Sequence, residues 1–326
     1  MNFPAHAYLL ALLSAFAASW ASLPLWRAWC LRRGVVDDPG HRKIHAEPTA
    51  LAGGLAVMTG LVLPLLGALV VIKLNLLGVE AADKLRYGFG KRAGQLTALF
   101  VGATGMLALG WLDDRHELRP APKFLGQLVI ASVVAVAGVR VTLFVPNVAF
   151  SYAVTVLWIL AVTNALNFMD NMNGLCAGLS VVASACFGLL AAQHQQYLVA
   201  SIAFLTCGAA LGFLPHNFPR AKSFLGDSGS HLLGFLLAVL AILPHFHSPK
   251  HPQPLAVLSP LLVLAVPLGD LAWVVGRRWR RGQPFYIGDT NHLSHRLVQR
   301  GLTRTGAVVL IWLLAAITGG AALLLT

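Results

Sequence analysis

Ten apolar runs separated by short polar segments constrain the fold of this chain. Each run is long enough, or nearly so, to cross a hydrocarbon core about 30 Å thick, which takes about 20 helical residues. Because 57% of the 326 residues are hydrophobic and 11% are charged, no soluble core of this size could hide the apolar side chains. We therefore expect an all-α fold, a polytopic bundle of ten or eleven transmembrane helices forming one domain over residues 1–326. The expected spans are residues 7–27, 51–72, 95–112, 124–139, 148–166, 174–193, 197–215, 229–245, 254–275 and 305–326.

Lysine and arginine residues predict how the bundle sits in the membrane. With ten spans, the loops after the odd-numbered spans share one side, and they carry 17 of the 24 basic residues. The positive-inside bias makes that side cytoplasmic. The first run has no basic segment before it, so we expect a retained span rather than a cleaved signal peptide. The net charge of +12 fits an anionic leaflet and an anionic substrate, and we expect no nucleic-acid partner.

Acidic residues gather on the same side. Nine of the twelve lie in the expected cytoplasmic loops, only Glu80 and Asp83 lie in an outer loop, and Asp270 lies inside the ninth run. A transporter would bury its carboxylates near the bilayer midplane, so the pattern favours a site in a cytoplasmic cleft. Asp270 is either a functional intramembrane carboxylate or the ion-pair partner of Arg277 or Arg278.

The segment NALNFMDNMNG, residues 164–174, holds the densest polar cluster between two apolar runs. Its polar residues are Asn164, Asn167, Asp170, Asn171 and Asn173. Carboxylate and amide oxygens suit Mg²⁺ and sugar hydroxyls rather than zinc. Helix capping by Asn173 is the alternative, but capping accounts for only one of the five.

Three more carboxylates stand at the ends of apolar runs. Asp113 and Asp114 end the third run, and Lys123 opens the fourth. Adjacent carboxylates repel each other, and a divalent cation or a bound cationic group would relieve the repulsion; a solvated turn is the alternative. Asp227 begins another helix, where its carboxylate is expected to hold Mg²⁺ while first-turn amides from residues 228–230 hold phosphate. Simple N-capping by Asp227 is the alternative.

Two basic segments complete the pattern. Lys43 and His45 lie in the first cytoplasmic loop, and His292, His295 and Arg296 lie in the last. Such groups suit phosphate oxygens, and two histidines among arginines make a weak zinc signal. Both segments are otherwise explained as positive-inside anchors, although an anchor does not need histidines.

Five motifs occur here in one order: DDPGHRKIHAEPTALAGG, WLDDRHELRPAPKFLGQ, NALNFMDNMNGL, FLGDSGSHLLGF and HLSHRL. In this order and spacing, the chain resembles the polyprenyl-phosphate N-acetylhexosamine-1-phosphate transferases of glycosyltransferase family 4, from about residue 32 to residue 301. The resemblance implies a bacterial inner-membrane enzyme with its site facing the cytoplasm. It would transfer a sugar 1-phosphate, most simply N-acetylglucosamine 1-phosphate, from a UDP-sugar to undecaprenyl phosphate and release UMP. It implies Mg²⁺, with Mn²⁺ as a substitute, and leaves a homodimer open.

The resemblance also implies roles for single residues. Asp227 matches the principal metal ligand, with Asp114 and Asp170 as further candidate ligands. Catalytic positions fall on Asp113, Asp114, Asp170, His292, His295 and Arg296, the last three as a pyrophosphate clamp. Substrate-binding positions fall on Lys43, His45, Lys123, Asn164, Asn167, Asn173, Asn217 and Phe224, with Phe224 expected to stack on uracil.

Two departures from the family pattern leave the sugar open. Asn171 and Asn173 stand where a Gly and an Asp are usual, and Ser294 replaces the middle histidine of the terminal motif. A phospho-N-acetylmuramoyl-pentapeptide transferase is the alternative within the enzyme class, although that branch usually has a denser terminal histidine cluster. A membrane transporter is the alternative from another class.

Overall fold

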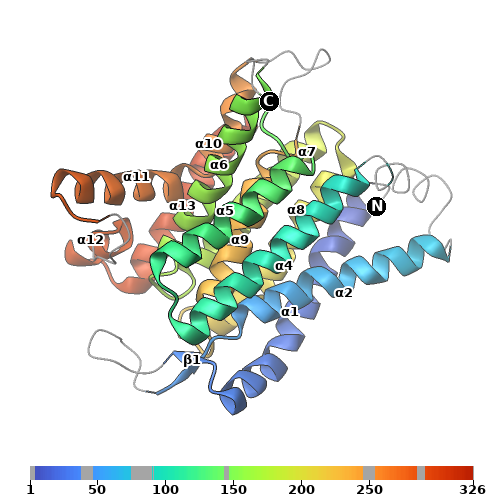
Figure 1. Ribbon diagram of the computed structural model, residues 1–326. Coiled ribbons are helices and arrows are strands. Elements are labelled where there is room, and N and C mark those ends of the chain that lie inside the picture. The colour runs from blue at the N-terminus through green and yellow to red at the C-terminus, as the bar shows by residue number, and fades with distance from the viewer. Residues whose placement is uncertain are drawn as a thin grey trace.

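The computed structural model describes residues 4–37, 47–74, 90, 92–142, 147–244, 254–284 and 291–325. Helices dominate these residues and run alongside one another in a bundle, while α11 and α12 extend from one side of it (Figure 1). The helices are α1 (Ala5–Arg33), α2 (Gly53–Lys73), α4 (Ala93–His116), α5 (Pro120–Val136), α6 (Val148–Phe168), α7 (Leu175–Gln193), α8 (Tyr197–Asn217), α9 (Gly226–Leu240), the 3₁₀ helix η1 (Pro254–Leu258), α10 (Ser259–Val263), α11 (Ala265–Arg280), α12 (Leu293–Gln299) and α13 (Arg304–Leu323).

Each expected span corresponds to helical structure, but the helices are not equally suited to cross a membrane. In the described part of the chain, seven helices are long and apolar enough: α1, α2, α4, α6, α7, α8 and α13. The ninth expected span is broken, because its two halves, Leu255–Val263 and Ala265–Arg280, meet at an angle of 71°. Helices α5 and α9 are apolar but shorter. The all-α, multi-pass membrane fold is therefore confirmed, with seven spans by length and composition, or eight if the bent pair is one.

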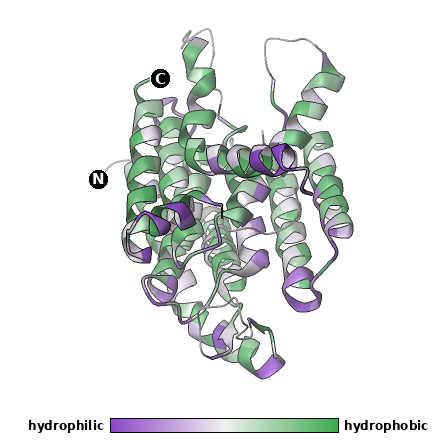
Figure 2. Cartoon of the chain, turned by 90° about the vertical axis from the view of Figure 1, so that its left-hand side faces the viewer, coloured by the Kyte–Doolittle hydropathy of each residue, from purple (hydrophilic) through white to green (hydrophobic). Residues whose placement is uncertain are grey.

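The outer surface of the bundle is suited to lipid. Large apolar side chains such as Leu10, Leu66 and Leu157 are more than half exposed. Hydrophobic residues cover most of the helical length, and hydrophilic residues concentrate at helix ends and connections (Figure 2). In water such a surface would be unfavourable, whereas in a bilayer it needs no partner.

Helix α9 occupies the centre of the bundle and contacts α4, α6 and α2. All of its residues are buried except Asp227. Its 15 residues span about 22 Å, less than a bilayer core, at the usual rise per residue. Because protein rather than lipid surrounds α9, the polar residues of its first turn are tolerated at depth.

Two glycines allow the first turn of α9 to pack closely. A Cβ atom on Gly110 of α4 would overlap the backbone carbonyl of Asp227. A Cβ atom on Gly54, in the first turn of α2, would lie 2.7 Å from the backbone nitrogen of Gly229. These close contacts fix where the Asp227 backbone sits between α4 and α2.

A small hairpin, which the sequence did not predict, joins α1 to α2. Strands β1 (Val36–Asp37) and β2 (Thr49–Ala50) pair antiparallel, and both chain ends lie on the side of the bundle away from them (Figure 1). The carbonyl of Ala50 accepts hydrogen bonds from the Ser223 hydroxyl at 2.8 Å and from the Phe224 amide at 2.9 Å. The hairpin therefore anchors the segment that leads into α9.

Candidate active site

A cavity of about 1320 Å³ opens between loops and helix ends that are distant in the sequence. Its lining comes from the β1 strand, the end of α4, the α6–α7 loop, the α8–α9 segment, α12 and the start of α13. Its carboxylate residues are Asp37, Asp113, Asp114, Glu117, Asp170 and Asp227. Its basic and amide residues are Arg220, Arg304, His295, Asn167, Asn171, Asn173, Asn217 and Gln299. The structure thus brings together residues from all five sequence motifs, with Asp37 coming from the first of them.

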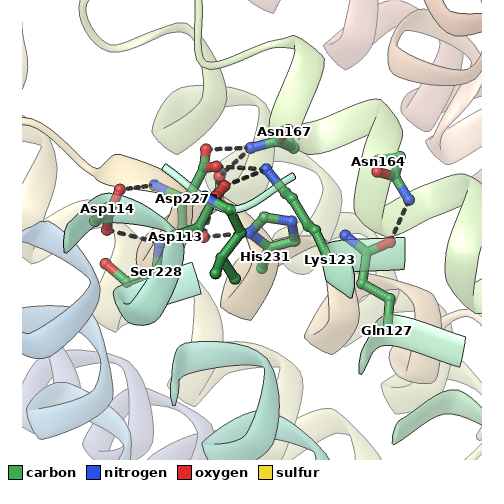
Figure 3. Close-up of polar contacts among 11 residues, drawn as sticks. Asp113, Asp114, Lys123, Gln127, Asn164, Asn167, Asp227, Ser228 and His231 are labelled. Carbon is green, nitrogen blue, oxygen red and sulfur yellow. Dashed lines mark hydrogen bonds and ion pairs between the residues drawn. The ribbon is translucent and has the colours of Figure 1, made fainter. Parts of the chain in front are cut away.

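An ammonium group joins two of the carboxylates. The Nζ atom of Lys123 lies 2.6 Å from Oδ2 of Asp113 and 2.5 Å from Oδ2 of Asp227 (Figure 3). The amide of Asn167 donates to Oδ1 of Asp227 at 2.7 Å and to the Ser230 hydroxyl at 2.9 Å. The sequence predicted a bound cationic group as one way to relieve carboxylate repulsion, and the lysine provides it here.

Asp114 caps the first turn of α9 from another helix. Its Oδ1 accepts from the amide of Asp227 at 2.7 Å, and its Oδ2 accepts from the amide of Ser228 at 3.0 Å (Figure 3). The expectation that the first-turn amides of residues 228–230 hold phosphate is therefore wrong for Ser228, because Asp114 already accepts from its amide. N-capping by Asp227 is wrong as well, since Leu225 stands at the N-cap and Asp227 lies inside the helix.

The α6–α7 loop carries part of the polar cluster that the sequence shows between residues 164 and 174. Helix α6 ends at Phe168, and Asp170 follows in a turn. The backbone amide of Asp170 donates to the Asn167 carbonyl at 3.1 Å. Burial, together with the charges of Asp227 and Asp114, raises the pKa of Asp170 to about 8. At neutral pH this carboxyl group therefore holds a proton that a metal ion would have to displace.

The neighbouring asparagines have different positions. Asn173 lines the cavity, and its amide donates to the carbonyl of Pro219 at 3.3 Å. Its expected alternative role as a helix cap is wrong, because Gly174 stands at the N-cap of α7 without a side-chain cap. Asn164 lies away from the cavity lining and donates to Oε1 of Gln127 at 2.7 Å (Figure 3).

Asn217 and Phe224 border the cavity where a nucleoside was expected. The side chain of Asn217 is 3% exposed. Its Oδ1 accepts from the amide of Gly174 at 2.6 Å, and its Nδ2 donates to the carbonyl of Ser223 at 2.9 Å. Asn217 thus ties the α6–α7 loop to the segment that carries Phe224, so it shapes the cavity wall whatever else it contacts.

The three candidate residues of the last loop, His292, His295 and Arg296, have different surroundings. His295 lines the cavity, whereas His292 is buried, with Nδ1 2.7 Å from Oδ2 of Asp270. The guanidinium of Arg296 lies 4.6 Å from the ring centre of Trp273. Asp270 therefore pairs with His292 rather than with Arg277 or Arg278, so the expected pairing is wrong.

Some functional candidates lie outside the sequence predictions, and others lie outside the structure. Arg220 and Arg304 line the cavity, although Arg304 looks from the sequence like an ordinary basic flank of the last span. The buried ring of His231 places Nδ1 2.5 Å from the backbone carbonyl of Asp227, directly below the acidic cluster (Figure 3). Lys43 and His45 fall outside the described residues, so their expected roles remain predictions.

The donor atoms around Asp227 fit a hard divalent cation. They are carboxylate and amide oxygens, the ligand types that Mg²⁺ prefers. Among the described residues, no three His, Cys, Asp or Glu side chains already form a metal-binding group. The Lys123 ammonium instead lies between two of the acids.

The fold and the cavity together define an integral-membrane protein with a polar site for charged ligands. A family model described as glycosyl transferase family 4 matches residues 96–245. A Bacillus subtilis protein named "Probable undecaprenyl-phosphate N-acetylglucosaminyl 1-phosphate transferase" is 32% identical over 310 residues, covering 93% of this chain and 80% of the relative. The decaprenyl-phosphate N-acetylglucosaminephosphotransferase of Mycobacterium tuberculosis H37Rv is 35% identical over 333 residues, covering 94% and 79%. A Yersinia pestis undecaprenyl-phosphate alpha-N-acetylglucosaminyl 1-phosphate transferase is 30% identical over 320 residues, covering 94% and 81%.

The chain belongs to glycosyl transferase family 4 and is a membrane-bound transferase. The family resemblance expected from the five motifs is thus confirmed, and the transporter alternative is wrong.

Proposed function

We infer that this enzyme transfers N-acetylglucosamine 1-phosphate from UDP-N-acetylglucosamine to undecaprenyl phosphate in the presence of Mg²⁺. UMP leaves, and the lipid-linked pyrophosphoryl sugar begins a cell-envelope glycan. The observation that carries this proposal is one cavity, lined by both acids and arginines, in a chain whose relatives are named for this transfer. The acids suit a metal, and the arginines suit phosphate.

We place the cavity at the cytoplasmic face of a bacterial inner membrane. Its lining includes Asp37 of the β1 strand, and both chain ends lie on the side of the bundle away from that strand (Figure 1). The loops predicted to be cytoplasmic carry most of the Lys and Arg residues, as the positive-inside bias requires. Chain ends on the side away from the hairpin agree with an even number of crossings, and ten is the number we propose.

The charge of the lining requires cations. Six carboxylates and two arginines line the cavity, yet the donor carries an anionic pyrophosphate. Without a cation the acids would repel it. We assign Mg²⁺ to Asp227, with Asp170 and Asp114 as further ligands; when bound, Mg²⁺ would supply charge neutralisation at the pyrophosphate.

The chain's own residues would perform the remaining work. A phosphate monoester has a second pKa near 6, so the acceptor phosphate is largely ionised at neutral pH and needs little help from a base. Its difficulty is electrostatic repulsion from the donor. Arg220, Arg304 and His295 line the cavity where they can neutralise phosphate oxygens, and Lys123 holds Asp113 and Asp227 in place.

The nucleoside and sugar ends of the donor have separate candidate contacts. Phe224 presents an aromatic ring to the cavity for stacking on uracil. Asn173 lines the cavity through the α6–α7 loop, and we assign it to the sugar.

The first test uses purified protein in detergent with Mg²⁺, undecaprenyl phosphate and a panel of UDP-sugars, including the muramoyl-pentapeptide donor. UMP release and the mass of the lipid product are followed together. We expect product with UDP-N-acetylglucosamine and none with Asp227→Asn. A product from another donor would overturn the sugar assignment, and full activity of a folded Asp227→Asn variant would overturn the site.

A further inference from the structure

Helix α12 is short, yet it carries a residue that lines the cavity. It has seven residues, Leu293–Gln299, and it brings His295 to the site. A helix of this length is marginal by itself, so contacts with the rest of the protein must determine where it lies. Two sets of polar contacts reach the start of α12, one from α11 and one from the α6–α7 loop.

The first set comes from Asp270 of α11. Oδ2 of Asp270 lies 2.7 Å from Nδ1 of His292, and Oδ1 accepts from the amide of Leu293 at 2.6 Å. Asp270 is 4% exposed and His292 is 5% exposed. Both carboxylate oxygens are therefore committed to α12, one to its N-cap residue and one to its first amide. Hydrogen bonds to a charged group shielded from water are the stronger kind.

The second set comes from the α6–α7 loop. The Ser294 hydroxyl donates to Oδ1 of Asn171 at 2.6 Å, and Nδ2 of Asn171 donates to the carbonyl of Phe168 at 2.6 Å. Ser294 is fully buried, whereas Asn171 lines the cavity. Because Oδ1 of Asn171 accepts and Nδ2 donates, the side-chain amide cannot flip by 180° without losing both hydrogen bonds.

The two sets converge on the end of α6. The ring of Phe168 meets the His292 ring edge-on, with centroids 5.6 Å apart, and the guanidinium of Arg278 lies 5.4 Å from its centre. The last turn of α6, the loop after it, α11 and α12 thus form one contact region beside Asp170. A shift of α12 would break bonds on both sides at once.

We propose that Asp270, Asn171 and Ser294 form a polar clamp that positions α12 for catalysis, so that His295 meets the donor phosphates. The proposal rests on the function proposed above. Asn171 and Ser294 are also positions where the chain departs from the family pattern. Their contact makes the two departures a matched pair rather than two separate losses. These residues act through α12 and are positioning residues.

The clamp predicts coupled effects on turnover. Displacing a reacting or neutralising group by about 1 Å costs up to about 100-fold in rate. We expect Ser294→Ala and Asn171→Ala each to lower kcat about tenfold, with a smaller change in the KM for the lipid acceptor. The double variant should lose no more than Asn171→Ala alone, because both single changes remove the bond between Ser294 and Asn171, and Asn171→Ala also removes the bond to Phe168. Asp270→Asn should lower kcat at least as much, since it removes the charge that holds His292.

Two matched variants separate positioning from general loss of packing. Ser184→Ala removes an equally buried hydroxyl that donates to the carbonyls of Ser180 and Val181 within α7 and lies away from the cavity lining, and it should leave kcat unchanged. Ser294→Thr keeps the hydroxyl and should retain most activity. If Ser294→Thr does not fold, the cycle of single and double alanine variants still shows whether Ser294 and Asn171 act together. Additive losses in that cycle, or a Ser294→Ala enzyme as active as wild type, would overturn the clamp.

A second readout does not depend on activity. Arg300 is exposed at the end of α12, and the four native cysteines are buried. A nitroxide spin label attached at Arg300→Cys would therefore report selectively on the mobility of α12. Its spectrum should show a restrained label in the otherwise native protein and a more mobile one with Ser294→Ala or Asp270→Asn. Identical spectra would refute the clamp, whereas failure of the native enzyme to transfer any sugar would refute the proposed function alone.

Discussion

Replacing Lys123 by methionine would test whether the acidic cluster carries its own counter-cation. The change keeps most of the side-chain length and removes the ammonium between Asp113 and Asp227. Two carboxylate oxygens that each lie 2.5 or 2.6 Å from Nζ are within about 5 Å of each other. Their repulsion at that distance is about 3 kcal/mol with an effective dielectric constant of about 20.

Neither carboxylate can turn away freely. Oδ1 of Asp113 accepts from the amide of Leu118 at 2.7 Å, and Oδ1 of Asp227 accepts from Asn167 at 2.7 Å. Breaking a buried ion pair usually costs 3–5 kcal/mol. Because the side chains of Lys123 and Asp227 are 19% and 31% exposed, solvent screens the pair and we expect a smaller cost, about 2–3 kcal/mol.

Thermal unfolding in detergent, with EDTA or with Mg²⁺, measures this effect. Lys123→Met should unfold at a lower temperature than wild type in EDTA, and Mg²⁺ should restore more of the loss than it adds to wild type. Mg²⁺ should also bind at least about tenfold more tightly, since a positive charge near the metal has gone. Lys222→Met, at an exposed lysine, is the control. Equal stability of Lys123→Met and wild type in EDTA, or weaker Mg²⁺ binding, would refute the reasoning.

The capping, packing and protonation of the site lead to three further expectations. Asp114→Asn should lower the free energy of unfolding by about 1–2 kcal/mol because α9 loses its charged cap; unchanged thermal stability would contradict the cap. Gly110→Ala should reduce the yield of folded protein, whereas Gly67→Ala, whose added Cβ meets nothing within 4 Å, should not. Titrations should show Mg²⁺ affinity rising between about pH 6.5 and 8.5, since a proton must leave Asp170, whose pKa is about 8. Asp170→Asn should make that slope shallower, and an unchanged slope would contradict the role of Asp170.

The helices could be predicted from the sequence because a membrane span must be long, apolar and hydrogen-bonded within itself. The same rule does not distinguish a helix that faces lipid from one that faces protein. Helix α9 was therefore expected to be an ordinary span, although 14 of its 15 residues are buried inside the bundle. The break before Ala265 was also missed, although Pro260 and Pro267 stand on either side of it.

The residues of the site were easier to predict than their contacts. Polar residues at the ends of apolar runs are costly, so they stood out at Asp113, Asp170 and Asp227 without any structure. Which donor each carboxylate meets depends on how the helices pack. The capping of α9 by Asp114, more than a hundred residues earlier, leaves no local signal. Arg304 was missed because a basic residue beside a span is also the usual membrane anchor.

The division between Asp113 and Asp114 bears on how mutational surveys of this enzyme should be interpreted. Neighbours on a helix point about 100° apart, and here one faces a lysine while the other caps α9. A growth-based complementation screen would score both positions as essential. Measuring cellular abundance alongside growth should separate them: Asp114 variants should be depleted by quality control, whereas Asp113 variants should accumulate as inactive protein.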